Sequence, residues 1–198
     1  MSRRTKGKTP GRKRSLVAGA PEGADHFSTA SLIGANLTPL VGVLFFGWDA
    51  ATDFCRKLSA KTGKAVRLPT EAEWEYACRA GSTTRFCFGD VDEGLADYGW
   101  SLDNGRGKTQ PVGQKKPNAW GLYDMHGNVS EWCADWYGEY PNGPVTDPQG
   151  PAAGYDRVLR GGCVYFNSYN CRAAYRNKCA PGDGTSENGI RVVVSVSR

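Results

Sequence analysis

Cysteine thiols offer the most obvious chemistry in this sequence. The chain has seven cysteines, an odd number, so at least one thiol is unpaired within a monomer. Thiolates could bind a soft metal or form disulfides, but no pair has C-x-x-C spacing, and the chain has only two histidines. A zinc or histidine-built metal site is therefore not expected, and the sequence does not choose disulfide partners. The thiols are those of Cys55, Cys78, Cys87, Cys133, Cys163, Cys171 and Cys179.

Two short helices are expected to position the first of these thiols. The stretch Asp49–Ser59 has apolar residues at helical spacing, and Gly63 follows as a stop. Thr70 and Glu73 then form a capping box, in which each side chain satisfies a backbone N–H of the helix start. Gly81 is expected to end this second helix. Its predicted buried stripe is Trp74, Ala77 and Cys78.

The rest of the chain favours a loop-rich α+β domain. Glycine and proline are abundant, with 26 and 11 residues, and all the tryptophans fall between Trp48 and Trp136, which predicts the densest core there. Gly189–Val196 alternates apolar residues and is expected to be a central strand buried on both faces. Leu40–Phe46 is an apolar run too short for a membrane span, so a buried strand is expected there instead.

The net charge of +5 belongs to the N-terminus. Seven of the 25 basic residues lie in the first 14 positions, and the rest of the chain is slightly acidic. We therefore divide the chain into a basic, disordered tail (1–27) and a single domain (28–198). Such a tail could contact nucleic acid, although nothing else in the sequence supports that. Membrane insertion is not expected, and the absence of a recognisable cleavable signal favours an intracellular or virion location.

Three segments carry a family resemblance. They read RLPTEAEWEYA at Arg67–Ala77, GLYDMHGNVSEW at Gly121–Trp132 and RVLRGG at Arg157–Gly162. Together with the later Cys171-Arg172, Tyr175-Arg176 and Gly189–Arg191, this pattern resembles the formylglycine-generating enzyme (sulfatase-modifying factor) family over residues 41 to 196. The resemblance implies a variant of the C-type lectin fold, an α+β domain with two short helices, small antiparallel sheets and long structured loops.

The same resemblance bears on catalysis. The oxygen-dependent enzymes of the family hold copper with two thiolates five residues apart, just after the Arg-Gly-Gly motif, because copper(I) prefers soft ligands. Here Phe166 occupies the first of those positions and Cys171 lies near the second, while Cys163 is eight residues from Cys171. We therefore expect no copper and no enzymatic activity. An oxidoreductase with unusual cysteine placement, acting on a protein cysteine, is the alternative.

A structural calcium ion is implied by resemblance alone. The family's calcium ligands correspond here to Asp124, Gly127, Val129 and Glu131, and hard oxygen ligands of this kind suit calcium. In the alternative interpretation, Asp124 caps a turn and Glu131 bonds to the backbone. His126 stands in the same turn and is expected to be exposed and incidental.

The C-terminal part also resembles the variable proteins of diversity-generating retroelements, with a variable region at about 157–191. Arginines and glycines keep the family pattern there, while aromatic and small polar residues fill the positions between them, as in an antibody paratope. We therefore expect a non-catalytic ligand-binding protein with a macromolecular partner; a plain interaction domain is the other alternative. Val164 is expected to be buried, as are the framework residues Arg160 and Arg172. The candidate ligand-binding residues are Cys163, Tyr165, Phe166, Asn167, Ser168, Tyr169, Asn170, Tyr175, Asn177, Lys178, Asp183, Thr185 and Ser186.

Overall fold

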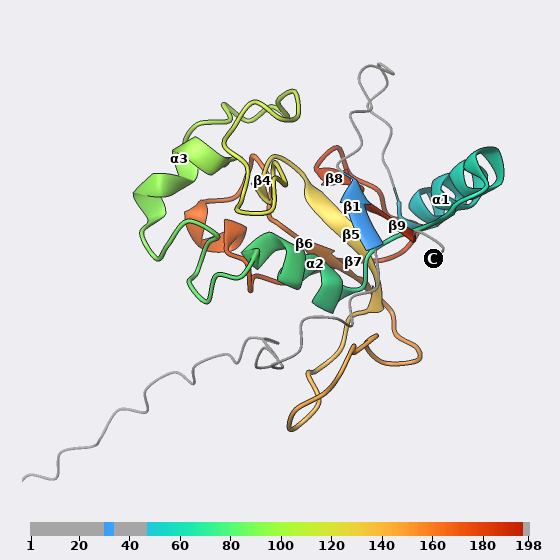
Figure 1. Cartoon of the computed structure of the whole chain (residues 1–198). Coiled ribbons are helices and arrows are strands. Elements are labelled where there is room, and N and C mark those ends of the chain that lie inside the picture. Colours follow the sequence, from blue (N-terminus) through green and yellow to red (C-terminus); the bar gives the residue numbers. More distant parts are fainter. Residues whose placement is uncertain (1–29, 34–46, 196–198) are drawn as a thin grey trace, which may run out of the picture.

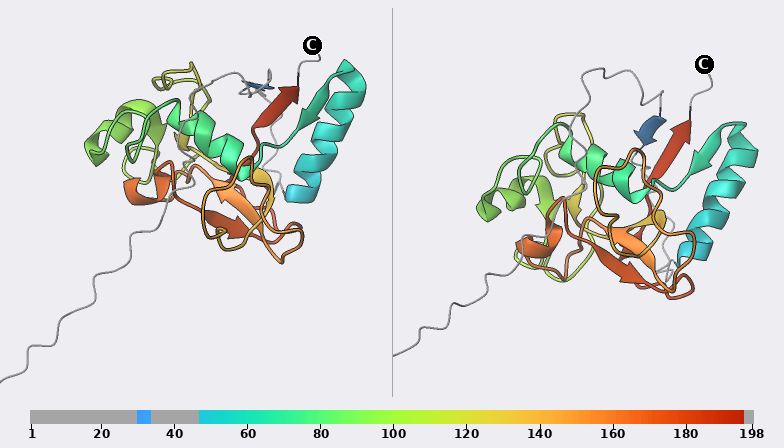
Figure 2. Two further views of the ribbon diagram at one scale, coloured as in Figure 1. Left: turned by 60° about the horizontal axis from the view of Figure 1, so that its bottom comes forward. Right: turned by 90° about the horizontal axis from the view of Figure 1, so that it is seen from below.

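The computed structural model describes residues 30–33 and 47–195, which form three short helices and three small sheets (Figure 1). Helices α1 (Trp48–Thr62) and α3 (Leu95–Tyr98) lie at opposite ends of this body, with α2 (Glu71–Arg79) between them (Figure 2). The predicted tail and the apolar run Leu40–Phe46 lie outside the described residues. The α+β class is thus confirmed, with α3 as an additional helix.

Helix ends follow the local sequence closely. Helix α1 ends at Gly63, which adopts a left-handed conformation with φ of 67°. The capping box of α2 is confirmed, because the Thr70 hydroxyl accepts from Glu73 N at 3.2 Å and Glu73 Oε2 accepts from Thr70 N at 2.9 Å. The end of α2 differs from the prediction, since Ala80 rather than Gly81 takes the left-handed position that closes the helix.

One sheet is built around the C-terminal strand. Its order is β1-β9-β2, with β9 (Val192–Ser195) antiparallel to both β1 (Ala30–Ile33) and β2 (Ala65–Arg67). The valines of β9 are buried on both faces, as predicted. However, the predicted strand Gly189–Val196 is split, because Gly189 belongs to a strand of a different sheet.

That second sheet has the order β7-β6-β5-β8. Strand β5 pairs antiparallel with β6 and parallel with β8, and β6 pairs antiparallel with β7. A third, two-stranded sheet joins β3 and β4 in parallel. The expected antiparallel sheets are therefore supplemented by two parallel pairs. The remaining bounds are β3 (Gly99–Trp100), β4 (His126–Gly127), β5 (Ser130–Trp136), β6 (Arg157–Arg160), β7 (Asn177–Cys179) and β8 (Asn188–Gly189).

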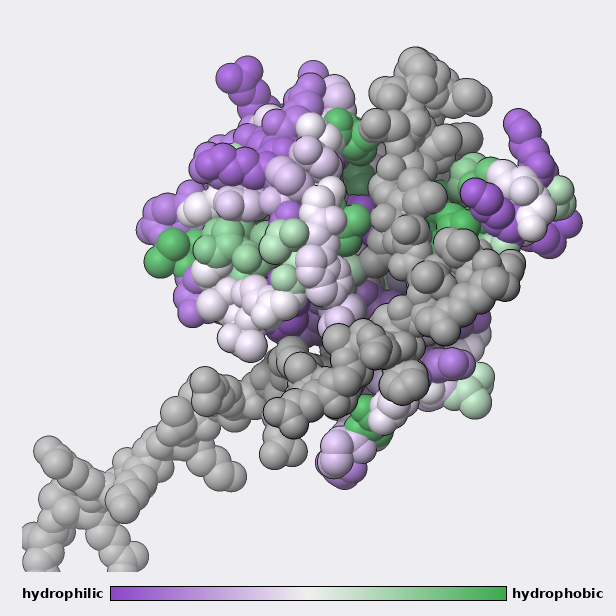
Figure 3. All heavy atoms as spheres, viewed as in Figure 1, coloured by the Kyte–Doolittle hydropathy of each residue, from purple (hydrophilic) through white to green (hydrophobic). Residues whose placement is uncertain are grey.

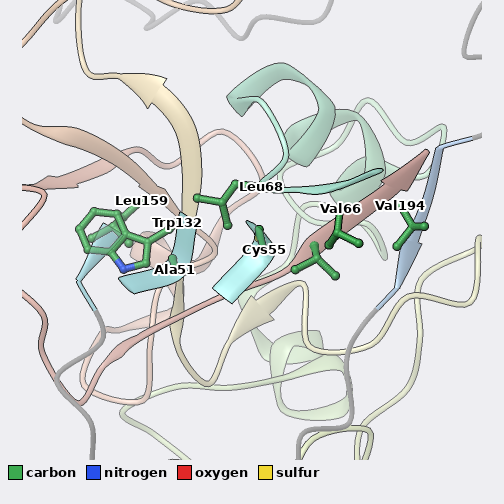
Figure 4. Close-up of a cluster of buried hydrophobic side chains, with 8 residues drawn as sticks. Ala51, Cys55, Val66, Leu68, Trp132, Leu159 and Val194 are labelled. Atoms are coloured by element: carbon green, nitrogen blue, oxygen red, sulfur yellow. The ribbon is translucent and has the colours of Figure 1, made fainter. Parts of the chain in front are cut away.

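Buried side chains form three clusters. The first packs α1 against the two larger sheets; Figure 4 shows Cys55 and Leu68 between Trp132 at one end and Val194 at the other. The second lies under α2 around Trp74, as the predicted stripe requires. The third surrounds Phe86 and includes Cys171. No helix in the described part of the chain is long and apolar enough to cross a membrane.

Candidate ligand-binding surface

Two glycines turn the chain out of the sheet after β6. Gly161 and Gly162 have φ values of 93° and 76°, in the region that side chains other than glycine rarely adopt. A Cβ atom on Gly162 would lie 2.6 Å from the carbonyl oxygen of Asn170. The glycine pair therefore lets the segment 163–171 fold back on itself in close contact.

The loop that follows starts with two buried residues and then alternates between exposed and half-buried residues from Tyr165 to Asn170. Val164 is buried, as expected, whereas Tyr165 and Tyr169 are 44% and 57% exposed. Asn167 is exposed as well, and Phe166 is half-buried against the third cluster. Cys163 was expected on the surface, and this is wrong: it is completely buried, because Gly162 directs the chain inward before it emerges at Tyr165.

Hydrogen bonds hold this loop against earlier parts of the chain. The N–H of Leu102 donates to the Phe166 carbonyl at 2.8 Å. The Ser168 hydroxyl donates to Asp92 Oδ2, also at 2.8 Å, which ties η2 (Ser168–Cys171) to η1 (Asp92–Gly94). The loop is thus backed by two segments that lie some 70 residues upstream.

These upstream segments add apolar surface that the sequence analysis did not identify. Val91 and Leu102 are 64% and 54% exposed; Val91 precedes Asp92, which accepts from Ser168, and Leu102 itself donates its N–H to Phe166 O. Figure 3 shows apolar residues among hydrophilic ones at the α3 end of the molecule. The only sequence signal for Val91 is its isolation between two aspartates.

A buried arginine fixes the start of the loop. Arg160, at the end of β6, is completely inaccessible to solvent and pairs through Nη2 with Glu75 Oε2 on α2. Its guanidinium also donates to the carbonyl oxygens of Tyr175 at 2.6 Å and Ala173 at 2.8 Å. Glu71 of α2 lies 3.6 Å from Nη1. The prediction for Arg160 is confirmed: it joins α2 to both ends of the candidate surface.

Arg172 does not share this role, contrary to expectation. Its guanidinium lies 3.5 Å from the ring centroid of Tyr169 and donates to the Tyr169 carbonyl, at a half-buried position. Arg176 instead makes the second link to α2, donating to both Glu71 oxygens at 2.6 and 2.8 Å. The difference arises because Arg172 immediately follows η2, on the same outer turn as Tyr169.

The other candidate residues divide into separate groups. Tyr175 stays with the loop, its ring 6.1 Å from that of Phe166. Lys178 is on β7, paired with Asp156 at 2.7 Å, beside Asn177 at the sheet edge away from η2 (Figure 1). Asp183, Thr185 and Ser186 belong to the connection between β7 and β8, which contacts the start of α1 through the bond from Asp49 N to Pro181 O. Tyr165, Phe166, Asn167, Ser168, Tyr169, Asn170 and Tyr175 are the members that the structure brings together.

His126 is buried beneath the loop rather than exposed as expected. Its Nε2 accepts from Cys87 N at 3.1 Å, so Nδ1 carries the proton and donates to the Cys171 carbonyl at 2.9 Å. Burial lowers the pKa of His126 to about 4, which keeps the ring neutral. This side chain therefore supports the end of η2.

The thiols near the loop are poorly suited to soft-metal chemistry. Burial raises the pKa of Cys163 to about 11 and that of Cys171 to about 12. Both are therefore thiols at neutral pH, whereas metal ligation and nucleophilic attack require thiolates. In the described part of the chain, no group of three or more His, Cys, Asp and Glu side chains is arranged to hold a metal ion.

The two carboxylates of the turn implicated in calcium binding, Asp124 and Glu131, differ in how many of their oxygens are already bonded. Asp124 has φ of 56°, and its Oδ2 accepts from Gly113 N at 2.7 Å, while its buried Oδ1 has no partner among the described residues. Burial raises the pKa of this carboxyl. Glu131 is fully engaged, since its oxygens accept two bonds from Arg191 at 2.8 Å and one from Trp74 Nε1 at 2.6 Å. A cation that prefers oxygen ligands thus fits Asp124 better than Glu131. Glu131 does not make the expected bond to the backbone but bonds to the side chains of Arg191 and Trp74 instead.

Comparisons with known proteins agree with this architecture. Residues 20–196 match the family described as Sulfatase-modifying factor enzyme 1-like domain. The chain is 38% identical over 188 residues to the formylglycine-generating enzyme of Streptomyces coelicolor, covering 86% of this chain and 56% of the enzyme. It is also 38% identical over 165 residues to the serine/threonine-protein kinase pkn1 of Chlamydia pneumoniae, covering 80% of this chain and 24% of the kinase. Among solved structures, Treponema denticola variable protein 1 has a TM-score of 0.72 at 30% identity, covering 86% of this chain and 77% of that one.

Proposed function

The chain belongs to the family of sulfatase-modifying factor enzyme 1-like domains, and we propose that within this family it is a non-catalytic ligand-binding protein. Its fold is the C-type lectin-type fold of the formylglycine-generating enzyme variant, as in the Treponema variable protein. It spans only about half or less of the curated relatives named above. The activities in their names are therefore not transferred to this chain.

The observation that carries the proposal is the contrast within the segment 160–171. Arg160, Val164 and Cys171 are buried and fixed, while Tyr165 and Tyr169 project outward beside Asn167. Aromatic side chains provide contact area with few torsions to immobilise, and asparagine provides adaptable hydrogen bonds. A fixed frame of this kind tolerates exchange of the outward residues, as a diversified recognition surface requires.

The proposed partner is a macromolecule that contacts Tyr165, Asn167 and Tyr169, together with Val91 and Leu102. These residues are exposed, and the bonds from Leu102 N to Phe166 O and from the Ser168 hydroxyl to Asp92 hold their segments side by side. Exposed aromatic and aliphatic side chains rimmed by polar groups are typical of protein-recognition surfaces. Among diversified versions of this protein, the three loop positions would vary and the two upstream positions would stay constant.

A pair of matched libraries tests this proposal. One randomises Tyr165, Asn167 and Tyr169; the control randomises Val164, Ala173 and Cys171, which are buried. We expect most members of the first library to fold and to yield binders when selected against an arbitrary test protein. Members of the control library should aggregate. Equal loss of folded protein in both libraries would show that the three outward residues are structural.

An oxidoreductase of the formylglycine-generating type is the second candidate, because a 38% identical relative carries that name. The chemistry of Phe166 and of the protonated Cys163 and Cys171 argues against it. Anaerobic copper(I) titration should give no tight stoichiometric complex, and a cysteine-containing peptide should not be converted in the presence of oxygen. Tight 1:1 copper binding with oxygen-dependent conversion of the peptide would establish the enzyme instead.

A structural calcium ion is a further part of the proposal. We expect Asp124 Oδ1 and the carbonyls of Gly127 and Val129 to supply oxygen ligands, with Glu131 contributing only if it shares its oxygens with Arg191. An ion bound only by the folded state stabilises it, so a chelator should lower the melting temperature. The Asp124→Ala variant should be insensitive to the chelator. If the chelator does not affect the wild-type protein, Asp124 is a turn cap.

A further inference from the structure

A cavity of about 420 Å³ lies between the start of α2 and the long connection from β5 to β6. This connection is the orange loop that extends below the sheets in Figure 1. Three prolines, Pro141, Pro148 and Pro151, contribute apolar wall, together with Val145 and the ring of Tyr140. The volume is in the range of small-molecule sites. No residue of the loop 163–171 lines the cavity, so it is separate from the proposed ligand surface.

One carboxylate in the lining has an unused oxygen. Asp135, on β5, is only 4% exposed, and its Oδ2 accepts from Glu71 N in the first turn of α2 at 2.7 Å. No other described residue donates to Oδ1, which faces Gly150 across the lining. Asp135 lines the cavity and uses only Oδ2 for the bond from α2, so Oδ1 is available to accept a hydrogen bond from a ligand.

The remaining charged groups of the lining indicate the sign of that ligand. Glu71, Asp135 and Glu139 are acidic, and Arg176 is the one basic residue among the lining residues. Arg176 is fully used, since it donates to both oxygens of Glu71 and to the Gly138 carbonyl, with Tyr137 and Tyr140 on its faces. The cavity thus has excess negative charge and no cation left for an anionic ligand.

We propose that this cavity binds a small organic cation, whose amidinium, guanidinium or ammonium group donates to Asp135 Oδ1. The apolar body of the ligand would lie against Val145 and the prolines. A charged donor to a buried carboxylate makes a stronger bond than a neutral donor, which gives the site its preference for cations.

Asp135 also gives the site a pH dependence that the test can use. Burial raises the pKa of Asp135 to about 6, and the carboxylates of Glu71 and Glu73 on α2 act in the same direction. Arg157 on β6 is the basic group that interacts with it. Most Asp135 side chains are therefore protonated at pH 5 and ionised at pH 7.5. Cation binding should be about tenfold weaker at the lower pH.

Calorimetric titration of the full chain with benzamidine tests the proposal, with benzamide as the neutral molecule of the same shape. We expect benzamidine to bind and benzamide not to bind. Asp135→Asn should weaken benzamidine at least tenfold, because the amide can still accept from Glu71 N but carries no charge. Glu139→Gln, which removes an exposed lining carboxylate, should change the affinity less than threefold.

Equal binding of both compounds, or full-strength binding to Asp135→Asn, would overturn the proposal, as would no benzamidine binding at millimolar concentration. If Asp135→Asn does not fold, the pH dependence of the wild-type protein replaces it, and equal affinity at pH 5 and 7.5 would be the contrary result. A comparison of agmatine with N-acetylarginine amide then shows whether the natural cation is a free small amine or the side chain of a peptide.

Discussion

The frame around Arg160 and the loop 163–171 meet at Gly161 and Gly162, and their residues are held in opposite ways. In the frame, Arg160 is buried and Arg176 half-buried against carboxylates of α2, and each donates several hydrogen bonds. In the loop, backbone bonds hold the chain, while Tyr165 and Tyr169 face solvent. The backbone of the loop is therefore fixed without fixing the identity of its outward side chains. That separation is what a recognition surface with exchangeable residues needs.

The sharpest test of this contrast is truncation in the frame. Arg160→Ala leaves Glu75 and two carbonyls without their buried donor, and breaking a buried pair on one side costs about 3–5 kcal/mol of unfolding free energy. Urea denaturation measures this. Arg172→Ala is the matched control and should cost at most about 1 kcal/mol, since it loses mainly a stacking contact on Tyr169. Similar losses in both variants would remove the distinction between frame and loop.

The next largest effect concerns His126, which supports Cys171 from below. The pKa of His126 is about 4 in the folded chain and about 6.5 when unfolded, so the unfolded chain binds an extra proton between these values. The contribution of His126 to the free energy of unfolding is therefore complete above pH 6.5. It falls by about 3 kcal/mol as the pH drops towards 4.

Asp135 opposes this effect in the same pH window, because its raised pKa lets the folded chain bind a proton first. We would therefore measure the free energy of unfolding at pH 7 and at pH 4.5 for both wild type and His126→Asn, and compare the two losses on acidification. The variant should lose less stability on acidification than the wild-type protein. Parallel pH profiles would show that His126 is not held neutral.

A smaller effect is expected at the junction itself. Gly162→Ala places a Cβ 2.6 Å from a backbone oxygen at a φ of 76°, which should cost about 1–3 kcal/mol. Gly182→Ala is the control, because Gly182 is exposed and its added Cβ would have no atom within 4 Å. Thermal melting compares the two variants. If Gly162→Ala melts like Gly182→Ala, the loop does not depend on this close approach.

The smallest effects are expected on the proposed surface. Tyr165→Ala and Tyr169→Ala should each change the free energy of unfolding by no more than about 0.5 kcal/mol, as exposed substitutions usually do. Phe166→Ala should cost more, because its ring packs on the cluster around Phe86. A melting series measures all three. If both tyrosine variants unfold the protein, these rings are core and the surface is not available for recognition.

Local features were readable from the sequence because neighbours along the chain determine them. The capping box of α2 depends on Thr70 and Glu73, three residues apart, and the glycine stop of α1 depends on Gly63 alone. The alternation of β9 likewise predicted burial on both faces. Burial of Val164 and Arg160 followed from the family pattern of the Arg-Gly-Gly segment.

The tertiary structure alone decided which side chains share a surface. Cys163 is buried because Gly161 and Gly162 set the direction in which the chain re-enters the core, and Arg172 is only half-buried because it directly follows η2. His126 became buried because segments far apart in sequence, at Cys87 and Cys171, close over it. Burial and charge pairing depend on such distant contacts, which carry no local periodicity. The sequence therefore determined helices α1 and α2 and the family, while only folding determined α3, the turn at the glycine pair, the exposed face of the loop and the cavity beside Asp135.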